Sequence, residues 1–384
     1  MVDAARVKKA LGGTIPALDG LRGLAILLVL AHNFNPFDGA TSLPRKLVDI
    51  VMNAGWVGVQ LFFVLSGFLI TGILIDTKPA RNGYRAFFGR RLVRIFPLYY
   101  VSLFVALVVL PRLSLPASLA AGREHQIYLW TYVSNWVQPF GMTVALVPHF
   151  WSLAVEEQFY LVWPFVVRGL SARRLLQVAV GLLIVGLASR LAVRGALGNE
   201  EAAYMWTVCR VDALSFGALA AIAVRNPSML AWLVARERVL LVASLAGLLI
   251  LFGVTKGLPR VSFLEESLGY TALALCFAGW LLAAVVRHVR ADGAGGVLTL
   301  RPLREVGKYS YGMYVFHLPL HLLAGQRLLG GSVSDASLPV GLGYFAGATL
   351  ATFAAAFVSY HLLERHFLQL KRYFVAEAPR ATPR

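Results

Sequence analysis

Apolar runs of about twenty residues recur along nearly the whole chain, and short polar or basic segments separate them. The hydrocarbon core of a bilayer is about 30 Å thick, so a helix needs about 20 apolar residues to cross it. Runs of this length are typical of membrane-spanning helices. The pattern therefore predicts about ten spanning helices, at approximately residues 17–36, 54–76, 92–111, 150–168, 174–193, 205–225, 238–255, 266–288, 308–329 and 338–364.

Composition supports the same fold class. Hydrophobic residues make up 58% of the chain, and the mean hydropathy of +0.68 is far above that of a soluble domain. No stretch between the predicted spans could form a separate soluble domain. We therefore expect an all-α, polytopic membrane helical bundle, with one domain over residues 1–384 and short cytoplasmic tails at about 1–16 and 366–384.

Two stretches depart from this simple alternation. Residues 111–149 form the longest stretch between predicted spans and contain an aromatic segment, Ile127–Phe140. We interpret that segment as re-entrant or interfacial on the outer side, and an extra span is the alternative. The basic and aromatic stretch Tyr84–Tyr100 is expected to begin as an amphipathic helix on the cytoplasmic surface.

The net charge of +17 could indicate nucleic-acid binding, but the distribution of the charges favours a membrane protein. If the N-terminus lies inside, cytoplasmic segments hold 26 of the Lys and Arg residues and outer segments hold 9. This asymmetry follows the positive-inside rule. It predicts a multi-pass protein of the cytoplasmic membrane with both termini in the cytoplasm, a lipid bilayer as partner and no nucleic acid.

Arg22 and His32 both lie in the first predicted span. Ionisable groups are costly in hydrocarbon, so such a pair is a candidate functional site. Ten helical steps place His32 about 15 Å further along the helix and about 80° around it. A neutral imidazole can act as a general base near neutral pH. The alternative is a histidine that only hydrogen-bonds to a neighbouring helix.

Two further clusters carry charge at span ends or within spans. Arg91 and Arg94 share a helix face and could bind phosphate groups. The alternative is that these two arginines only anchor the helix at the membrane surface. Glu156 and Glu157 are adjacent and cannot face the same way on a helix. We expect one of them to face the bundle interior and to pair with an arginine, and a purely structural ion pair is the alternative.

The remaining polar groups within spans suggest contacts between helices. Arg210 and Asp212 are two residues apart, point to different faces and so need partners elsewhere. His317 taken alone is expected to be a helix-packing histidine. Gln60 and Ser66 lie in the second span. The two cysteines, Cys209 and Cys276, lie in different predicted helices and indicate neither a disulfide nor a metal site.

No motif of a soluble enzyme class, such as a phosphate-binding loop or a zinc-protease helix, is present in the sequence. Seven segments taken in order nevertheless resemble the acyltransferase-3 family of integral membrane acyltransferases, the O-antigen acetylase type. They extend from Ala17 to Phe367. The segments are ALDGLRGLAILLVLAHNF, GVQLFFVLSGFLITGIL, RRLVRIFPLYY, WSLAVEEQFYLVWP (which begins at Trp151), RVDALSFGAL, YSYGMYVFHLPL and SYHLLERHF.

The resemblance implies transfer of an acyl group, usually acetyl, from cytoplasmic acyl-CoA to a hydroxyl of a sugar or glycolipid. Acetyl-CoA would be a co-substrate, with no tightly bound cofactor and no metal. By this resemblance His32 is the catalytic base, and Arg22, Arg91 and Arg94 bind the donor. Further candidates for catalysis or for orienting the reacting groups are Glu156, Glu157, Gln60, Ser66, Trp151, Arg210, Asp212 and His317.

The chain departs from the family pattern in the first span. Only nine residues separate Arg22 from His32, where the family has ten, and Asn33 occupies the expected histidine position. Either the helix contains a local bulge, or His32 meets its partners from a different angle. A second departure is His366, where relatives often have proline.

A membrane transporter or flippase is the alternative function. In that case Arg22, His32 and the two glutamates would form a path for protons or substrate. Carriers often consist of repeated halves, and no internal repeat is obvious in this sequence. The arginine cluster at one end of the spans, with a histidine deeper in, instead suits an anionic donor that reaches inward.

Overall fold

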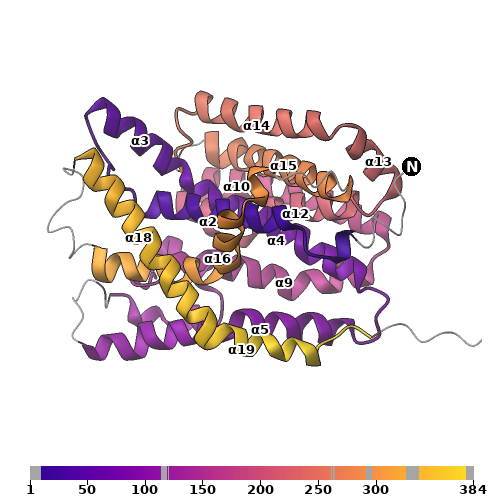
Figure 1. The fold of residues 1–384 in the computed structure, drawn as a ribbon, viewed down its shortest axis with the longest axis horizontal. Helices are drawn as coiled ribbons and strands as arrows, with labels where there is room; N and C mark the ends of the chain where they lie inside the picture. Colours follow the sequence, from indigo (N-terminus) through magenta and orange to yellow (C-terminus); the bar gives the residue numbers. More distant parts are fainter. Residues whose placement is uncertain are drawn as a thin grey trace, which may run out of the picture.

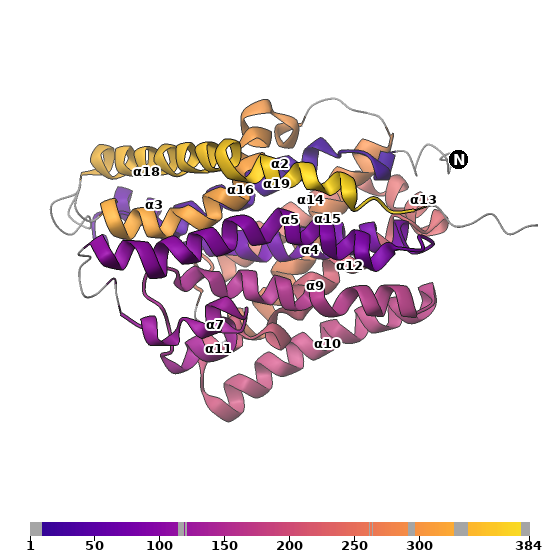
Figure 2. The same ribbon diagram turned by 90° about the horizontal axis from the view of Figure 1, so that it is seen from below.

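The computed structural model describes residues 10–113, 119, 121–260, 262, 264–290, 296–325 and 337–377. The outermost parts of both predicted tails and the end of the predicted span 308–329 lie outside these residues. Long helices run roughly parallel to one another and form a bundle (Figures 1 and 2). We call the end at which helices α2, α5 and α16 begin the basic end, and the opposite end the far end.

Long helices occupy all ten predicted positions. They are α2 (Pro16–Asn33), α4 (Val57–Asp76), α5 (Gly83–Phe104), α9 (Trp151–Gly169), α10 (Ala172–Leu197), α12 (Thr207–Ala223), α14 (Glu237–Val254), α15 (Tyr270–Arg290), α16 (Arg301–Leu320) and α18 (Leu338–Ser359). The shorter α-helices are α3 (Leu43–Asn53), α7 (Ile127–Trp130), α8 (Ser134–Val137), α11 (Glu200–Met205), α13 (Pro227–Ala235) and α19 (Arg365–Gln369).

Seven helical stretches in the described part of the chain are long and apolar enough to cross a membrane, so the prediction of about ten is approximate. They are Leu43–Asp76, Gly83–Leu113, Ala172–Leu197, Glu200–Ala223, Glu237–Val254, Glu266–Arg290 and Leu338–Tyr373. The three predicted spans outside this set are α2, α9 and α16. They carry the charges that lower their hydropathy, including Arg22, Glu156 and Arg304. The chain is therefore a multi-pass membrane protein whose most polar helices carry the candidate site.

Two local expectations can be compared with the structure. The stretch Tyr84–Tyr100 is helical and continues without a break into the third predicted span, because one helical stretch runs from Gly83 to Leu113. The aromatic segment Ile127–Phe140 contains only the four-residue helices α7 and α8 and a short 3-10 turn, Gln138–Phe140. It is therefore too interrupted to form an extra helical span.

Small residues let the central helices approach closely. A Cβ atom on Gly67 of α4 would lie 1.9 Å from the carbonyl oxygen of Leu214 on α12, and one on Gly217 of α12 would lie 2.0 Å from that of Val64. Such contacts explain how α4 packs directly on α12. Helix α2 lies at the centre of the bundle, beside α4 and α16 (Figure 1). Arg22 and His32 are therefore placed inside the protein, away from lipid.

Candidate functional site

A cavity near the basic end gathers most of the predicted charged residues. Helices α2, α4, α5, α9 and α16 all contribute to its wall. We call it the arginine cavity, and its polar lining residues are Arg22, Ser66, Arg91, Arg94, Ser152, Glu156, Glu157, Tyr160, Ser310, Tyr311 and Tyr314. Its volume of about 110 Å³ suits a narrow chain rather than a nucleotide. Arg94 is an exposed residue, whereas Arg22 and Arg91 are half-buried.

Polar contacts order one wall of this cavity. The Tyr160 hydroxyl donates to Ser66 Oγ over 2.9 Å, and Ser66 donates in turn to the Glu156 carboxylate. The guanidinium of Arg91 lies 4.8 Å from the centre of the Tyr160 ring. Arg22 is held from its own helix by an ion pair of 3.2 Å with Asp19. Side chains from four helices are thus fixed around one space.

The expected direct ion pair between a glutamate and an arginine is not found. In the described part of the chain, neither Glu156 nor Glu157 lies within 4.0 Å of an arginine nitrogen. The arginines on α2 and α5 and the glutamates on α9 instead line the same cavity. The cavity leaves room for a ligand among opposite charges.

A second cavity, of about 350 Å³, lies further along α2 and contains His32. We call it the histidine cavity, and its lining residues include His32, Asn33, Trp56, His149, Trp151, Glu201, Tyr204, Arg260 and His317. Val59 and Tyr314 line both cavities. The Tyr314 hydroxyl contacts Ser152 Oγ at 2.5 Å and donates to the His149 carbonyl over 2.9 Å. Tyr314 is therefore part of the thin wall between the two spaces.

The orientation of His32 suits a proton acceptor. Its Nδ1 lies 3.0 Å from the carbonyl oxygen of Asn53, at the end of α3. A carbonyl only accepts hydrogen bonds, so Nδ1 carries the proton in the neutral ring. Nε2 then has the free lone pair. Asn33, in contrast, donates its side-chain amide to the Val29 carbonyl of its own helix over 2.9 Å.

The shorter spacing between Arg22 and His32 is accommodated without a bulge. Helix α2 is α-helical from Pro16 to Asn33, and the Phe34 amide donates to the Leu30 carbonyl over 2.8 Å. The structure therefore excludes the bulge, and the alternative in which His32 meets its partners from a different angle stays a prediction.

Two histidines and an ion pair also line the histidine cavity. His317 is fully buried, and its Nδ1 lies 2.7 Å from the Tyr314 carbonyl of its own helix. Its ring centre is 4.7 Å from that of His149, so the packing role expected of His317 agrees with its contacts. Arg260 pairs with Glu201 over 2.8 Å. Burial by itself lowers the pKa of Arg260, but the hydrogen bonds to Glu201 outweigh it and raise that pKa above its ordinary value.

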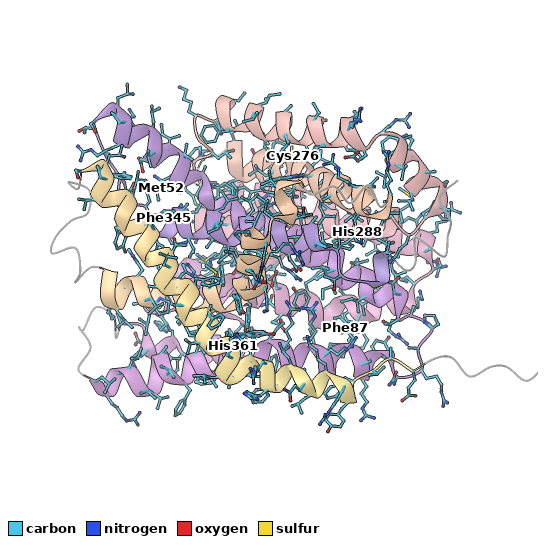
Figure 3. All side chains as sticks on the ribbon, in the orientation of Figure 1. Met52, Phe87, Cys276, His288, Phe345 and His361 are labelled. Atoms are coloured by element: carbon cyan, nitrogen blue, oxygen red, sulfur yellow. The ribbon has the colours of Figure 1, made fainter. Side chains whose placement is uncertain are left out.

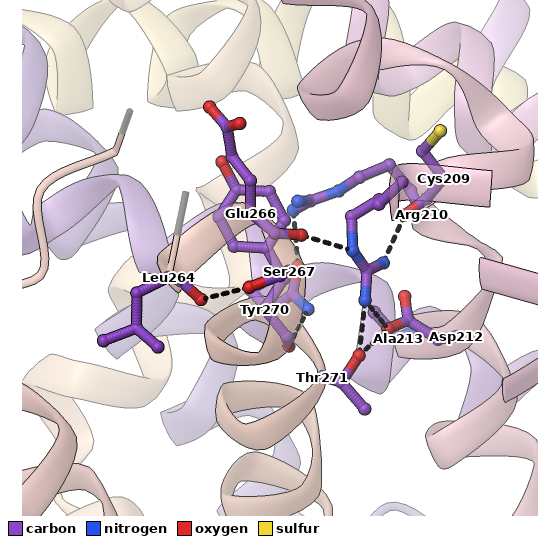
Figure 4. Close-up of polar contacts among 11 residues, drawn as sticks. Cys209, Arg210, Asp212, Ala213, Leu264, Glu266, Ser267, Tyr270 and Thr271 are labelled. Atoms are coloured by element: carbon purple, nitrogen blue, oxygen red, sulfur yellow. Dashed lines mark hydrogen bonds and ion pairs between the residues drawn. The ribbon is translucent and has the colours of Figure 1, made fainter. Parts of the chain in front are cut away.

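Gln60, Arg210 and Asp212 belong to neither cavity wall. Gln60 accepts from Arg210 and donates to the Tyr270 carbonyl over 2.7 Å. The Arg210 guanidinium lies 4.5 Å from the centre of the Tyr270 ring. Asp212 pairs with Arg190 at 2.8 Å. It also accepts from Thr271 over 2.7 Å, and Figure 4 labels both Asp212 and Thr271. As expected, Arg210 and Asp212 have separate partners, and these contacts tie α4, α10, α12 and α15 together.

Arg190 corrects one detail of the charge count. Arg190 is one of the nine Lys and Arg residues counted above in the outer segments, yet it is fully buried within α10. Its partner Asp212 explains how the bundle tolerates it. Other cavity residues that sequence reasoning missed are Ser152, Tyr160, Tyr204, Arg260, Tyr311 and Tyr314. Most are aromatic or hydroxyl side chains within apolar runs, and no pattern along the chain distinguishes them from ordinary packing residues.

Comparisons with known proteins identify the family of this chain. The family model described as an acyltransferase domain matches residues 15–362. The peptidoglycan O-acetyltransferase OatA of Listeria monocytogenes is 31% identical over 327 residues, which cover 80% of this chain and 49% of that protein. The O-acetyltransferase OatA of Staphylococcus aureus is 26% identical over 335 residues, covering 83% of this chain and 52% of that protein.

YrhL of Bacillus subtilis is 31% identical over 377 residues, which cover 91% of this chain and 54% of that protein. The chain thus spans about half the length of the curated relatives it matches. No solved structure matches it. Because the family model covers most of the chain, including both cavities, the chain belongs to the acyltransferase-3 family of integral membrane acyltransferases.

Proposed function

We propose that this protein is a membrane O-acyltransferase that moves an acetyl group from acetyl-CoA to a carbohydrate hydroxyl. The observation that carries the proposal is the pair of cavities along α2. One is lined by three arginines, the other contains His32 with Nδ1 bonded to a carbonyl, and Tyr314 lines both. A transporter would need no such oriented imidazole beside an arginine cluster.

The donor would bind from the basic end, which we assign to the cytoplasm by the positive-inside rule. The phosphates of CoA would lie at the mouth, against Arg94 and Arg91, because guanidinium groups bind phosphate through paired hydrogen bonds. The narrow pantetheine arm would enter the arginine cavity. Its thioester would then arrive at the Tyr314 wall, next to the space that contains His32.

The acceptor would bind in the histidine cavity. The aromatic side chains of Trp56, Trp151 and Tyr204 line it, and such apolar faces pack against sugar rings. The ion pair of Arg260 with Glu201 adds hydrogen-bonding groups at the same wall. The relatives named as peptidoglycan O-acetyltransferases make peptidoglycan the first acceptor to test.

The chemical step follows from these positions. Nε2 of His32 takes the proton of the acceptor hydroxyl as its oxygen attacks the thioester carbonyl carbon. The tetrahedral intermediate collapses, the carbon–sulfur bond breaks, and the CoA thiolate leaves. The imidazolium of His32 returns the proton to that sulfur. The products are an O-acetyl ester and free CoA, and the histidine is regenerated.

The decisive experiment replaces His32 with alanine in folded, membrane-inserted protein. Transfer of labelled acetyl from acetyl-CoA to peptidoglycan fragments should fall by about 10²-fold or more, the usual contribution of a general base. Binding of CoA, measured by thermal stabilisation, should persist. His366→Ala is the matched control, because His366 is exposed and lines neither cavity.

The two parts of the proposal can fail separately. Unchanged transfer by the His32→Ala protein would end the assignment of the base. The assignment of the donor would end if acetyl-CoA did not stabilise the wild-type protein and the wild-type protein did not transfer acetyl from it.

A further inference from the structure

A third cavity lies near none of these reacting groups. A separate space of about 640 Å³ opens between α14, α15 and the first turns of α2 and α16. On α2 it is lined by Leu24, which is two residues from Arg22 and so points about 160° away from it. The space and the arginine cavity therefore lie on opposite sides of α2. We call it the α14–α15 cavity.

The walls of this cavity are mainly apolar along its length. Leu241 and Leu245 line it from α14, Trp280 and Ala284 from α15, and Leu24 from α2. The two residues named on α14, like the two on α15, are four positions apart, which is about one helical turn or about 6 Å. Water gains little in such a space, whereas a hydrocarbon chain fills it favourably.

The end of the cavity nearest the basic end is cationic. Arg287 donates to Glu237 over 2.6 Å and 3.1 Å, so that carboxylate is already used. Arg304 lies at the same end, and its buried Nε has no hydrogen-bond partner. No carboxylate among the described residues pairs with Arg304. His288, labelled in Figure 3, lies beside them at the end of α15.

The N-termini of two helices add to the positive charge at this end of the cavity. Pro16 and Ala17 at the start of α2 line the cavity, and so do Leu298 and Thr299 just before α16. Helix N-termini have unpaired amide groups and the positive end of the helix dipole. An anion is therefore favoured at the mouth, and an apolar chain is favoured further in.

We propose that the α14–α15 cavity binds an anionic phospholipid, with its phosphate at Arg304 and one acyl chain along Leu241, Leu245 and Trp280. Basic sites between helices on the cytoplasmic side are a known mode of anionic headgroup binding. A soluble anion would satisfy Arg304 but leave the apolar wall empty. A lipid without net charge would fill the wall but leave the extra cations uncompensated. The lipid would support α2 from the side opposite the arginine cavity.

The test uses the full chain, delipidated in detergent, and measures thermal unfolding and native mass spectra. Phosphatidylglycerol should raise the unfolding temperature and remain bound, phosphatidylcholine should do so less, and inorganic phosphate should have no comparable effect. Arg304→Gln should weaken phosphatidylglycerol binding about tenfold, which is 1.4 kcal/mol. Arg301→Gln is the matched control, because Arg301 is exposed in the same turn and does not line the cavity.

A second variant tests the apolar part. Ala284→Trp should occupy the cavity and reduce phosphatidylglycerol retention while the lipid-free protein still folds. The proposal would be overturned if Arg304→Gln and Arg301→Gln weakened phosphatidylglycerol binding equally. It would also be overturned if phosphatidylcholine were retained as well as phosphatidylglycerol, or if inorganic phosphate stabilised the protein as much as phosphatidylglycerol does. Unchanged retention by the Ala284→Trp protein would overturn it as well.

Discussion

Arg94 offers the sharpest test of the donor site. It lines the arginine cavity and is exposed, and no carboxylate in the described part of the chain forms an ion pair with it. Arg22, in contrast, is already paired with Asp19, and Arg91 lies on the Tyr160 ring. Among these three arginines in the described part of the chain, Arg94 alone has neither an ion pair nor an aromatic ring partner, although the Glu364 carboxylate is near enough to interact with it electrostatically. We predict that Arg94→Gln weakens CoA binding more than it affects folding.

The expected magnitude follows from the exposure of Arg94. A hydrogen bond between charged groups contributes about 1.5–3 kcal/mol when it is partly buried. Arg94 is an exposed residue, and solvent screening lowers this range to about 1–2 kcal/mol. Since 1.4 kcal/mol is a tenfold change, the dissociation constant for CoA should rise about 5- to 30-fold. The effect should shrink as salt is added, because the Debye length falls from about 10 Å at 0.1 M to 3 Å at 1 M.

The assay is titration of purified protein with CoA, followed by calorimetry or thermal stabilisation. Arg90→Gln is the matched control, because Arg90 is exposed on the same helix but does not line the cavity. Dephospho-CoA, which lacks the 3′-phosphate, provides a second comparison. If Arg94→Gln and Arg90→Gln weaken binding equally, or if neither does so at low salt, the reasoning about the arginine cavity is wrong.

Three further predictions concern individual contacts. Asn33→Ala should lower acetyl transfer far less than His32→Ala, because the Asn33 amide is bonded to Val29 of its own helix; a larger loss in an acetylation assay would make Asn33 the more important residue. Arg190→Met should leave Asp212 buried without its cation and lower stability by about 3–5 kcal/mol; an unchanged unfolding temperature would contradict this, and Arg190→Met with Asp212→Leu should recover part of the loss. Gly67→Ala should reduce the yield of folded protein, because the new Cβ would lie 1.9 Å from the Leu214 carbonyl oxygen; Gly181→Ala, which would meet nothing within 4 Å, should not, and equal yields of the two proteins would disprove the close packing of α4 on α12.

The sequence by itself determined the positions of the helices and the presence of charges within them. Hydropathy is a local property, and a helix satisfies its backbone hydrogen bonds within one segment, so each span can be recognised separately. The same local pattern identified Arg22, His32, Arg91, Arg94 and Glu156 as unusual. Their cost in hydrocarbon is what made them informative.

Only the tertiary structure decided which of these groups meet. The tautomer of His32 depends on the Asn53 carbonyl from another helix, and the environment of Glu156 depends on Ser66 and Tyr160. Tyr314 divides the arginine cavity from the histidine cavity, although its own segment gives no sign of that role. Such contacts are set by the rotation and relative height of packed helices. Spacing within one helix fixes neither, because both are decided by side-chain packing across the whole bundle.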